Sequence, residues 1–172
     1  MKKEESVFVP ALKLFIICLV VALGLSALNY VTSPIITAAN EQKKKDAMSS
    51  VMEGCTFSEI DGTGVYEAKK DNELVGYTAS VTSPIGYGGD IDLIVGFDND
   101  LNVTGVSFVK MSETSGIGTK TRDEAWFTEQ FLGSPVPSED NFKAITGATV
   151  SSKAVRYGLE LAEKAVKEAS GK

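Results

Sequence analysis

A long apolar run near the N-terminus limits what this chain can fold into more strongly than any other feature of its sequence. Apolar residues dominate from Ala11 to Ile36, and Lys13 is the single charged residue among them. A helix needs about 20 such residues to cross the hydrocarbon core of a bilayer. The run therefore predicts a membrane-spanning helix, and the lipid bilayer is the first partner that we expect.

Two other kinds of segment share this composition, a cleaved signal peptide and a lipoprotein signal. A cleaved signal has an apolar region of roughly 7–15 residues followed by a small-x-small site. This run is longer and reaches Asn29 and Tyr30 without a convincing site. Cys18 is preceded by Ile17, where a lipid-attachment signal needs a small residue. We expect an uncleaved, single-pass anchor in the cell membrane.

The anchor divides the chain into segments. We expect an N-terminal tail over 1–9, a transmembrane anchor over 10–33, a helical connector over 34–54 and a folded domain over 55–172. Proline interrupts helical hydrogen bonding, so a kink is expected at Pro34. The positive-inside rule does not orient the span, because lysines flank it equally, at positions 2, 3 and 13 and at positions 43, 44 and 45.

Composition excludes several classes of function. The formal net charge is −6 and no stretch of clustered Lys and Arg is present, so we expect no nucleic-acid partner. The chain contains no His, which removes the commonest general base and a common metal ligand. Cys18 lies inside the apolar run and Cys55 well outside it, so neither a disulfide nor a zinc site is expected. We expect no metal and no catalytic side chain.

From Gly62 onward the sequence predicts strands and turns. Apolar and polar residues alternate in "GVYEAKK" and "LVGYTASVTS", which flank the turn "DNE". A second hairpin is predicted from "DIDLIVGF" and "NVTGVSFVK" around residues 98–100. That acidic turn lacks the third acidic position and the Gly of a calcium loop. These strands are expected to form one antiparallel sheet.

Helical patterns return after the predicted sheet. One covers "RDEAWFTEQFL", and another covers the C-terminal segment, where one apolar face is formed by Val155, Leu159, Ala162 and Val166. The fold class predicted is therefore α+β, with an N-terminal transmembrane helix followed by a domain in which helices pack on a twisted antiparallel sheet.

A hydroxyl-rich turn, "ITGATVSSKAV", precedes the C-terminal helix. Four hydroxyls surround the pair Gly147 and Ala148, those of Thr146, Thr149, Ser151 and Ser152. They are either helix caps, which satisfy the unpaired N–H groups of the first turn, or part of a site for a phosphate at the positive end of the helix. A hydroxyl in that place can also be esterified to the phosphate.

Two glycine-rich loops follow predicted strands, "SPIGYGGDI" and "SETSGIGTK". Neither contains a dinucleotide fingerprint or a Walker lysine. They are either plain turns or places where the main chain can approach a flat ligand closely.

Taken in order, the apolar span, "GYGGDI", "ETSGIG" and "TGATVSS" resemble the FMN-binding domain family. Within that family the chain is most similar to G subunits of the Rnf electron-transport complex. A similar domain occurs in the C subunit of the sodium-pumping NADH:quinone oxidoreductase, which is usually a longer chain. The resemblance covers Tyr66 to about Ala165 together with the anchor, so residues 55–172 are expected to form the FMN-binding domain.

The resemblance implies a covalent FMN cofactor. In the family the last Thr of the Ser/Thr-Gly-Ala-Thr motif carries FMN through a phosphoester, which a separate flavin transferase installs from FAD. That residue is Thr149 here. Family members often have Asp at the position of Lys143 and Pro at that of Ser115. By the same analogy the residues around the cofactor are Thr146, Gly147, Ala148, Ser151, Ser152, Glu113, Thr114, Gly116, Ile117, Gly118 and Tyr87.

The function implied by the resemblance is that of a membrane-anchored electron carrier. It would act with other membrane and peripheral subunits of a ferredoxin:NAD oxidoreductase complex coupled to Na⁺ or H⁺ transport, with no complete activity alone. Its flavin domain would lie on the extracytoplasmic side. The alternatives are a component like the C subunit of the sodium-pumping quinone reductase, and a non-redox bitopic binding or scaffolding protein whose loops and hydroxyl turn are structural.

Overall fold

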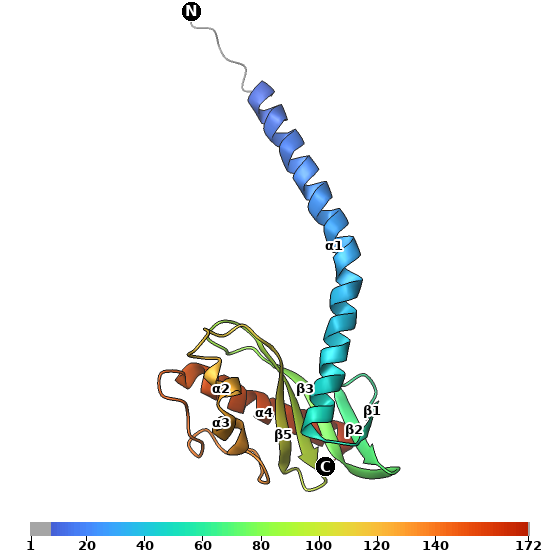
Figure 1. Ribbon diagram of the computed structural model, residues 1–172, viewed down its shortest axis with the longest axis vertical. Coiled ribbons are helices and arrows are strands. Elements are labelled where there is room, and N and C mark those ends of the chain that lie inside the picture. Colours follow the sequence, from blue (N-terminus) through green and yellow to red (C-terminus); the bar gives the residue numbers. More distant parts are fainter. Residues whose placement is uncertain (1–7, 172) are drawn as a thin grey trace, which may run out of the picture. The chain divides into compact units, whose positions relative to one another are not determined.

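The computed structural model of this protein describes residues 8–171. Lys2 and Lys3 of the expected N-terminal tail lie outside this range. The expected α+β fold is confirmed (Figure 1). In chain order the described elements are α1 (Phe8–Val51), β1 (Thr56–Glu59), β2 (Val65–Lys70), β3 (Glu73–Ser83), β4 (Ile91–Asp98), β5 (Val103–Met111), α2 (Lys120–Asp123), α3 (Ala125–Glu129) and α4 (Thr149–Ser170).

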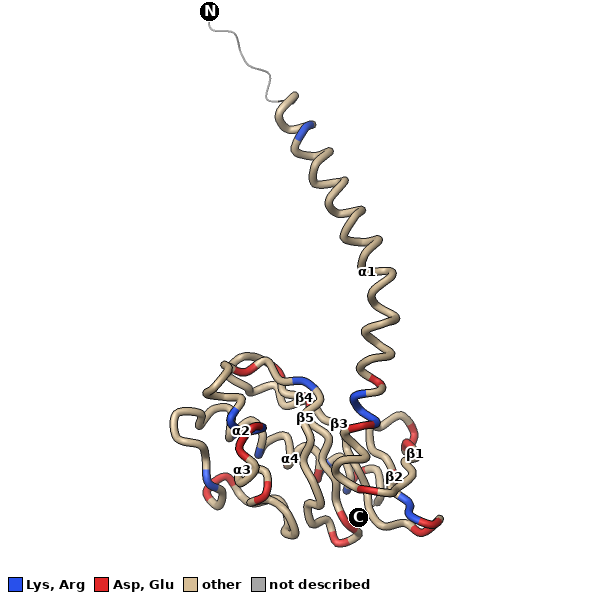
Figure 2. Tube along the Cα trace, in the orientation of Figure 1, with Lys and Arg blue, Asp and Glu red and all other residues tan. Residues whose placement is uncertain are grey.

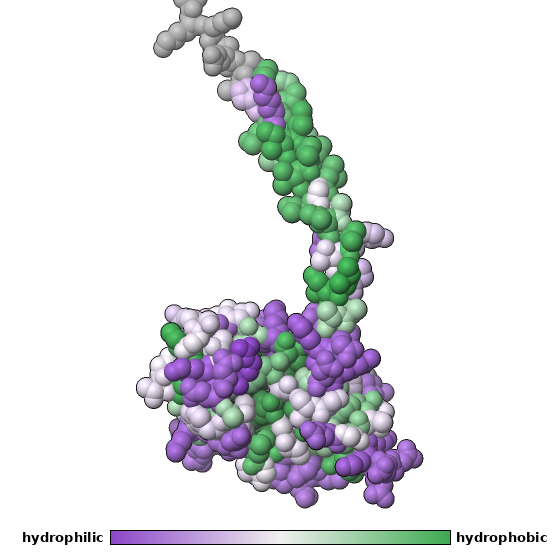
Figure 3. Space-filling model, viewed as in Figure 1, coloured by the Kyte–Doolittle hydropathy of each residue, from purple (hydrophilic) through white to green (hydrophobic). Residues whose placement is uncertain are grey.

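The apolar run forms most of α1, which continues through Pro34. Its 44 residues correspond to roughly 66 Å of helix at about 1.5 Å per residue. No charged residue lies between Lys13 and Glu41 (Figure 2). The side chains of this stretch form a hydrophobic surface (Figure 3) with a mean hydropathy of 2.6 in its most apolar window. The helix is long and apolar enough to cross a membrane.

The chain divides into two compact units, Met1–Glu41 and Gln42–Lys172. The boundary falls inside α1, so the last turns of this helix belong to the second unit. The separation into an anchor over 10–33 and a connector over 34–54 stays a prediction.

The second unit contains one sheet in the order β1-β2-β3-β4-β5, in which every neighbouring pair is antiparallel. Both predicted hairpins are confirmed. Asp71 and Asn72 link β2 to β3 with positive φ angles of 51° and 70°, a conformation that Asp and Asn tolerate well in two-residue turns. The sequence patterns do not predict β1, because its side chains are mostly exposed and show no apolar alternation.

The C-terminal helix α4 packs on one face of the sheet. Its predicted apolar face is confirmed, because Val155, Leu159, Ala162 and Val166 are fully buried. Gly158 lies directly against Leu93 of β4, so closely that a Cβ atom would collide with Leu93 Cδ1. Ser83 Oγ, at the end of β3, donates a 2.7 Å hydrogen bond to the carbonyl oxygen of Ala154. These contacts fix the N-terminal half of α4 against β3 and β4.

The last turns of α1 cover the opposite face of the sheet. Ala47, Met48 and Val51 are buried together with Ile94 of β4. Gly105 of β5 makes this approach possible, because a Cβ atom there would lie 2.7 Å from Val51 Cα. The sheet is therefore packed on both faces by helices.

The prediction of one helix over Arg122–Leu132 is wrong in its extent. The structure has α2 and α3 instead, separated at Glu124, which has extended backbone angles of φ −96° and ψ 103°. Phe127 and Phe131 are both fully buried, and their rings meet edge to face at 5.5 Å. Burial of these rings, rather than a continuous helical pattern, directs the chain here.

Candidate functional site

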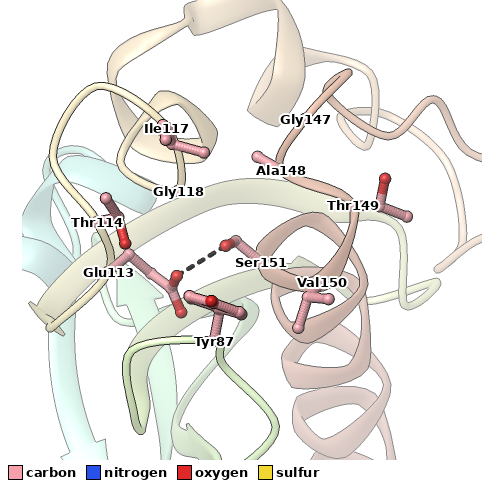
Figure 4. A pocket seen from close by; sticks show the side chains of 10 residues that line it. All are labelled: Tyr87, Glu113, Thr114, Ile117, Gly118, Gly147, Ala148, Thr149, Val150 and Ser151. Carbon is pink, nitrogen blue, oxygen red and sulfur yellow. Dashed lines mark hydrogen bonds between the residues drawn. The ribbon is translucent and has the colours of Figure 1, made fainter.

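Three segments that are far apart in the sequence meet at one end of the sheet. Because β3 and β5 both run antiparallel to β4, the loops that follow β3 and β5 leave the sheet at the same end. The first turn of α4 lies beside them (Figure 4). Together the segments enclose a pocket of about 520 Å³, a volume within the range that holds one small-molecule ligand.

Most residues predicted for the site line this pocket, and they come from all three segments. Val150 also lines it, although no sequence pattern singled it out. An apolar residue directly after the proposed acceptor threonine, on the exposed face of α4, was the available signal. The lining residues are Tyr87, Glu113, Thr114, Ile117, Gly118, Gly147, Ala148, Thr149, Val150 and Ser151.

Three of the predicted residues do not line the pocket. The hydroxyl of Ser152 is fully buried and shapes the turn, donating to the carbonyl oxygen of Ala148 at 2.9 Å and accepting from the N–H of Ile145 at 3.0 Å. Gly116 has a φ of +74° with open space where a Cβ atom would stand, so it serves the turn itself. Thr146 is exposed before the start of α4.

The hydroxyls do not cap α4, so the cap interpretation of this turn is wrong. The N-cap residue is Ala148, which offers no side-chain hydrogen bond. The first N–H groups of an α-helix have no partner within the helix, and they carry the positive end of its dipole. The helix start therefore faces the pocket without a side-chain acceptor of its own.

The surroundings of the hydroxyls distinguish Thr149 from the other candidates. Ser151 and Ser152 are buried, with exposed fractions of 2% and 0%, and both hydroxyls are hydrogen-bonded. Thr146 and Thr149 are exposed, but Thr149 alone of these two lines the pocket. Its hydroxyl thus combines access from outside with a position at the helix start.

Glu113 places a carboxylate inside the pocket although its side chain is only 8% exposed. It accepts a 2.7 Å hydrogen bond from Ser151 Oγ and a 3.3 Å hydrogen bond from the N–H of Gly88. Two further glycines make room for it, since a Cβ atom would lie 2.6 Å from its Oε1 on Gly86 and 2.5 Å from its Oε2 on Gly118. The glycines of both loops thus admit this carboxylate.

Apolar side chains surround the opening of the pocket. Tyr87, Ile117 and Val150 are 75%, 51% and 49% exposed, and Figure 4 shows each of them at the pocket. Covering exposed apolar surface with a ligand is favourable by about 25 cal/mol per Å² removed from water. A flat apolar group bound here would remove these three side chains from water.

The segment before α4 is held in place by Gln130, which directly follows α3, and by Lys153 of α4. The side chain of Gln130 binds the main chain of Lys143 at two points, accepting from its N–H at 2.8 Å and donating to its carbonyl oxygen at 3.2 Å. Lys153 of α4 pairs with Glu139 at 2.6 Å, and this hydrogen bond lowers the pKa of Glu139 below its ordinary value. The loop that leads to Thr149 is therefore anchored by these side-chain contacts.

Comparisons with known proteins identify the family of this chain. Residues 86–164 match the FMN-binding domain family, and this range contains every residue that lines the pocket. The chain is 30% identical to the G subunit of the Na⁺-translocating ferredoxin:NAD⁺ oxidoreductase complex of Acetobacterium woodii, over 90% of this chain and 89% of that protein.

Two further relatives carry related names. The G subunit of the proton-translocating ferredoxin:NAD⁺ oxidoreductase complex of Clostridium ljungdahlii is 30% identical over 99% of this chain and 97% of its own length. The G subunit of the ion-translocating oxidoreductase complex of Haemophilus influenzae is 37% identical over 53% of this chain and 50% of its own length. The chain therefore belongs to the family of Rnf complex G subunits and contains an FMN-binding domain.

Proposed function

We propose that this protein is a membrane-anchored electron carrier, and that it holds FMN in the pocket between the two glycine-rich loops and α4. It works as one redox subunit of a ferredoxin:NAD⁺ oxidoreductase complex that transports Na⁺ or H⁺, with no complete activity alone. The observation that carries this proposal is the convergence of all three motifs of the FMN-binding domain on one pocket.

The residues of the pocket fit the two ends of FMN. An uncapped helix start suits a phosphate, because its free N–H groups and the helix dipole both favour an anion. The exposed apolar side chains around the opening suit the flat, largely apolar ring system. When bound, FMN supplies electron transfer, while the protein tunes the cofactor by packing, hydrogen bonds and nearby charge.

Attachment of FMN at Thr149 is part of the proposal. The hydroxyl oxygen of Thr149 forms a bond to the phosphorus of the FMN half of FAD, the diphosphate bond breaks, and AMP leaves while the hydroxyl proton is lost. A flavin transferase catalyses this step. The exposure of Thr149 on the pocket supports this assignment. The hydroxyls of Ser151 and Ser152, in contrast, are buried and already hydrogen-bonded.

The expected partners are the other proteins of such a complex. The relatives are named as subunits of ion-translocating complexes, so this carrier is expected to work beside further membrane and peripheral subunits. In this proposal the segment 10–33 of α1 crosses the bilayer, the segment 34–54 leads out of it, and the flavin domain over 55–172 lies on the extracytoplasmic side.

Flavin fluorescence in a denaturing gel tests the proposal. The full chain, produced together with the transferase, should give a fluorescent band that survives denaturation. Thr149→Ala should abolish that band while the protein stays folded and membrane-bound. Thr146→Ala is the matched control, since it removes the neighbouring exposed hydroxyl that does not line the pocket, and it should keep the band. A band that persists in Thr149→Ala would place the attachment elsewhere.

A further inference from the structure

One buried acid, Glu113, lines the pocket. Glu113 follows β5, and Figure 4 shows its carboxylate directed toward Ser151. Both of its hydrogen bonds are donated to it, by Ser151 Oγ at 2.7 Å and by the N–H of Gly88 at 3.3 Å. An ionised carboxylate can only accept hydrogen bonds, and both partners here are donors.

This carboxylate connects the three segments that form the pocket. Its own residue belongs to the loop after β5, Gly88 belongs to the loop after β3, and Ser151 belongs to the first turn of α4. Hydrogen bonds to a charged group contribute more to stability than neutral ones. Removing the acceptor would leave the buried hydroxyl of Ser151, which is 2% exposed, without its partner.

The burial of Glu113, which is 8% exposed, and its two hydrogen bonds leave the carboxylate little freedom to move. A Cβ atom on Gly86 would lie 2.6 Å from Oε1, and one on Gly118 would lie 2.5 Å from Oε2. The charge is therefore held at one place on the pocket wall. Charges that are removed from water interact more strongly than charges at the surface.

We propose that Glu113 is a positioning residue with two effects: it joins the three pocket segments, and it sets the reduction potential of the bound flavin through its fixed negative charge. The second effect rests on the proposed FMN site. Reduction adds negative charge to the flavin unless each electron is matched by a proton. A fixed carboxylate on the pocket wall disfavours that added charge, so it lowers the midpoint potential.

The first effect is measured on the full chain in detergent, produced without the transferase. Thermal or denaturant unfolding of Glu113→Ala, Ser151→Ala and the double variant forms a double-mutant cycle, because alanine removes the acceptor whereas glutamine would keep one. We expect the unfolding constant to depart from additivity by at least tenfold, about 1.4 kcal/mol. Additive effects would show that the two side chains are not coupled, and would overturn the first part of the proposal.

The second effect is measured on the flavin-loaded full chain by redox titration of the visible spectrum. Glu113→Gln should favour the reduced flavin by about tenfold, which is 59 mV for a one-electron couple. Glu113→Asp keeps the charge and should stay closer to the native protein than Glu113→Gln does. Ser151→Ala also keeps the charge and should not raise the midpoint. Glu129→Gln is the control, because it removes one negative charge from an exposed site outside the pocket.

These measurements separate failure of this inference from failure of the proposed function. If the native chain carries no denaturation-resistant flavin, the proposed function fails, while the unfolding cycle still tests the link between Glu113 and Ser151. If flavin is present and Glu113→Gln leaves the midpoint unchanged, the electrostatic part is overturned. An equal rise in Ser151→Ala would assign the shift to altered packing and would overturn it as well. Should Glu113→Gln fail to fold, Glu113→Asp takes its place. A rise of the Glu113→Asp midpoint by as much as 59 mV, the tenfold shift expected for loss of the charge, would overturn the electrostatic part.

Discussion

A single methyl group added at Gly118 tests the packing between the loop after β5 and α4. The φ angle of Gly118 is not positive, so alanine meets no left-handed backbone penalty there. The added Cβ atom would lie 2.5 Å from Glu113 Oε2 and 2.8 Å from Ser151 Oγ. Because these two atoms are hydrogen-bonded to each other, the methyl group should push them apart.

The expected cost follows from these contacts. Overpacking a well-packed site costs about 1–3 kcal/mol, and a hydrogen bond to a charged group contributes about 1.5–3 kcal/mol. One movement relieves the overlap and lengthens the bond, so the two costs do not add. We expect Gly118→Ala to lower the free energy of unfolding by about 2 kcal/mol. A domain with an ordinary stability of about 5–15 kcal/mol stays folded after such a loss.

Gly116→Ala is the matched control for this substitution. Gly116 has a φ of +74° and open space where a Cβ atom would stand, so alanine there meets only the backbone penalty of about 1–2 kcal/mol. The two variants should therefore lose similar amounts of stability for different reasons. Only Gly118→Ala disturbs the pocket wall.

The assay compares three quantities in the full-length variants produced with the transferase. These are the denaturation-resistant flavin fluorescence, the native visible spectrum and the unfolding midpoint. Both variants should keep their covalent flavin, and only Gly118→Ala should change the spectrum. An unchanged spectrum in folded Gly118→Ala would contradict this prediction, because it would show that the loop after β5 is a simple turn. An equal spectral change in Gly116→Ala would assign the effect to general loosening.

Three further predictions concern the fold, its charges and the membrane. Gly158→Ala should destabilise the protein by about 1–2 kcal/mol in denaturant unfolding, because its Cβ atom collides with buried Leu93. In a Leu93→Ala background the same substitution should stabilise by up to about 1 kcal/mol through helix propensity. An effect of the same sign in both backgrounds would contradict this contact. Glu139 has a lowered pKa in the folded state, so its contribution to stability is present above its ordinary pKa and is lost as the pH falls through the lower folded value. The unfolding midpoints of the native protein and Glu139→Gln should therefore converge on acidification and in high salt. A difference between the two midpoints that widens at low pH would contradict this prediction. After Cys18→Ala, a membrane-impermeant maleimide should label Cys55 in intact cells, whereas labelling in opened cells alone would place the flavin domain in the cytoplasm.

Much of the fold could be predicted from local patterns. The apolar run, the two hairpins and the buried face of α4 each depend on residues close together in the sequence, so composition, alternation and helical spacing are sufficient to find them. The strand β1 and the break at Glu124 could not be predicted in this way. β1 is mostly exposed, and the break serves the burial of Phe127 and Phe131, which depends on distant parts of the chain.

The residues of the candidate site were predicted one by one from the resemblance. In the structure they differ in their exposure and in whether they line the pocket. Thr149 lies exposed on the pocket, Ser152 is buried in the turn, and Gly116 shapes the loop after β5 without lining the pocket itself. All three residues belong to the sequence motifs that carry the resemblance. A motif specifies residue types, whereas exposure depends on the backbone direction that the packed domain imposes.

Patterns along the sequence were sufficient to identify the long apolar helix, the alternation of the strands, the amphipathic helix and the family to which the motifs point. Packing between distant segments brings Glu113 to Ser151, 38 positions further along the chain, and places Gly86 and Gly118 where their missing side chains make room for this carboxylate. The difference comes from the range of the interactions. Secondary structure follows from neighbours along the chain, while a pocket forms where β3, β5 and α4 end together, which the antiparallel pairing of the sheet and the packing of α4 bring about.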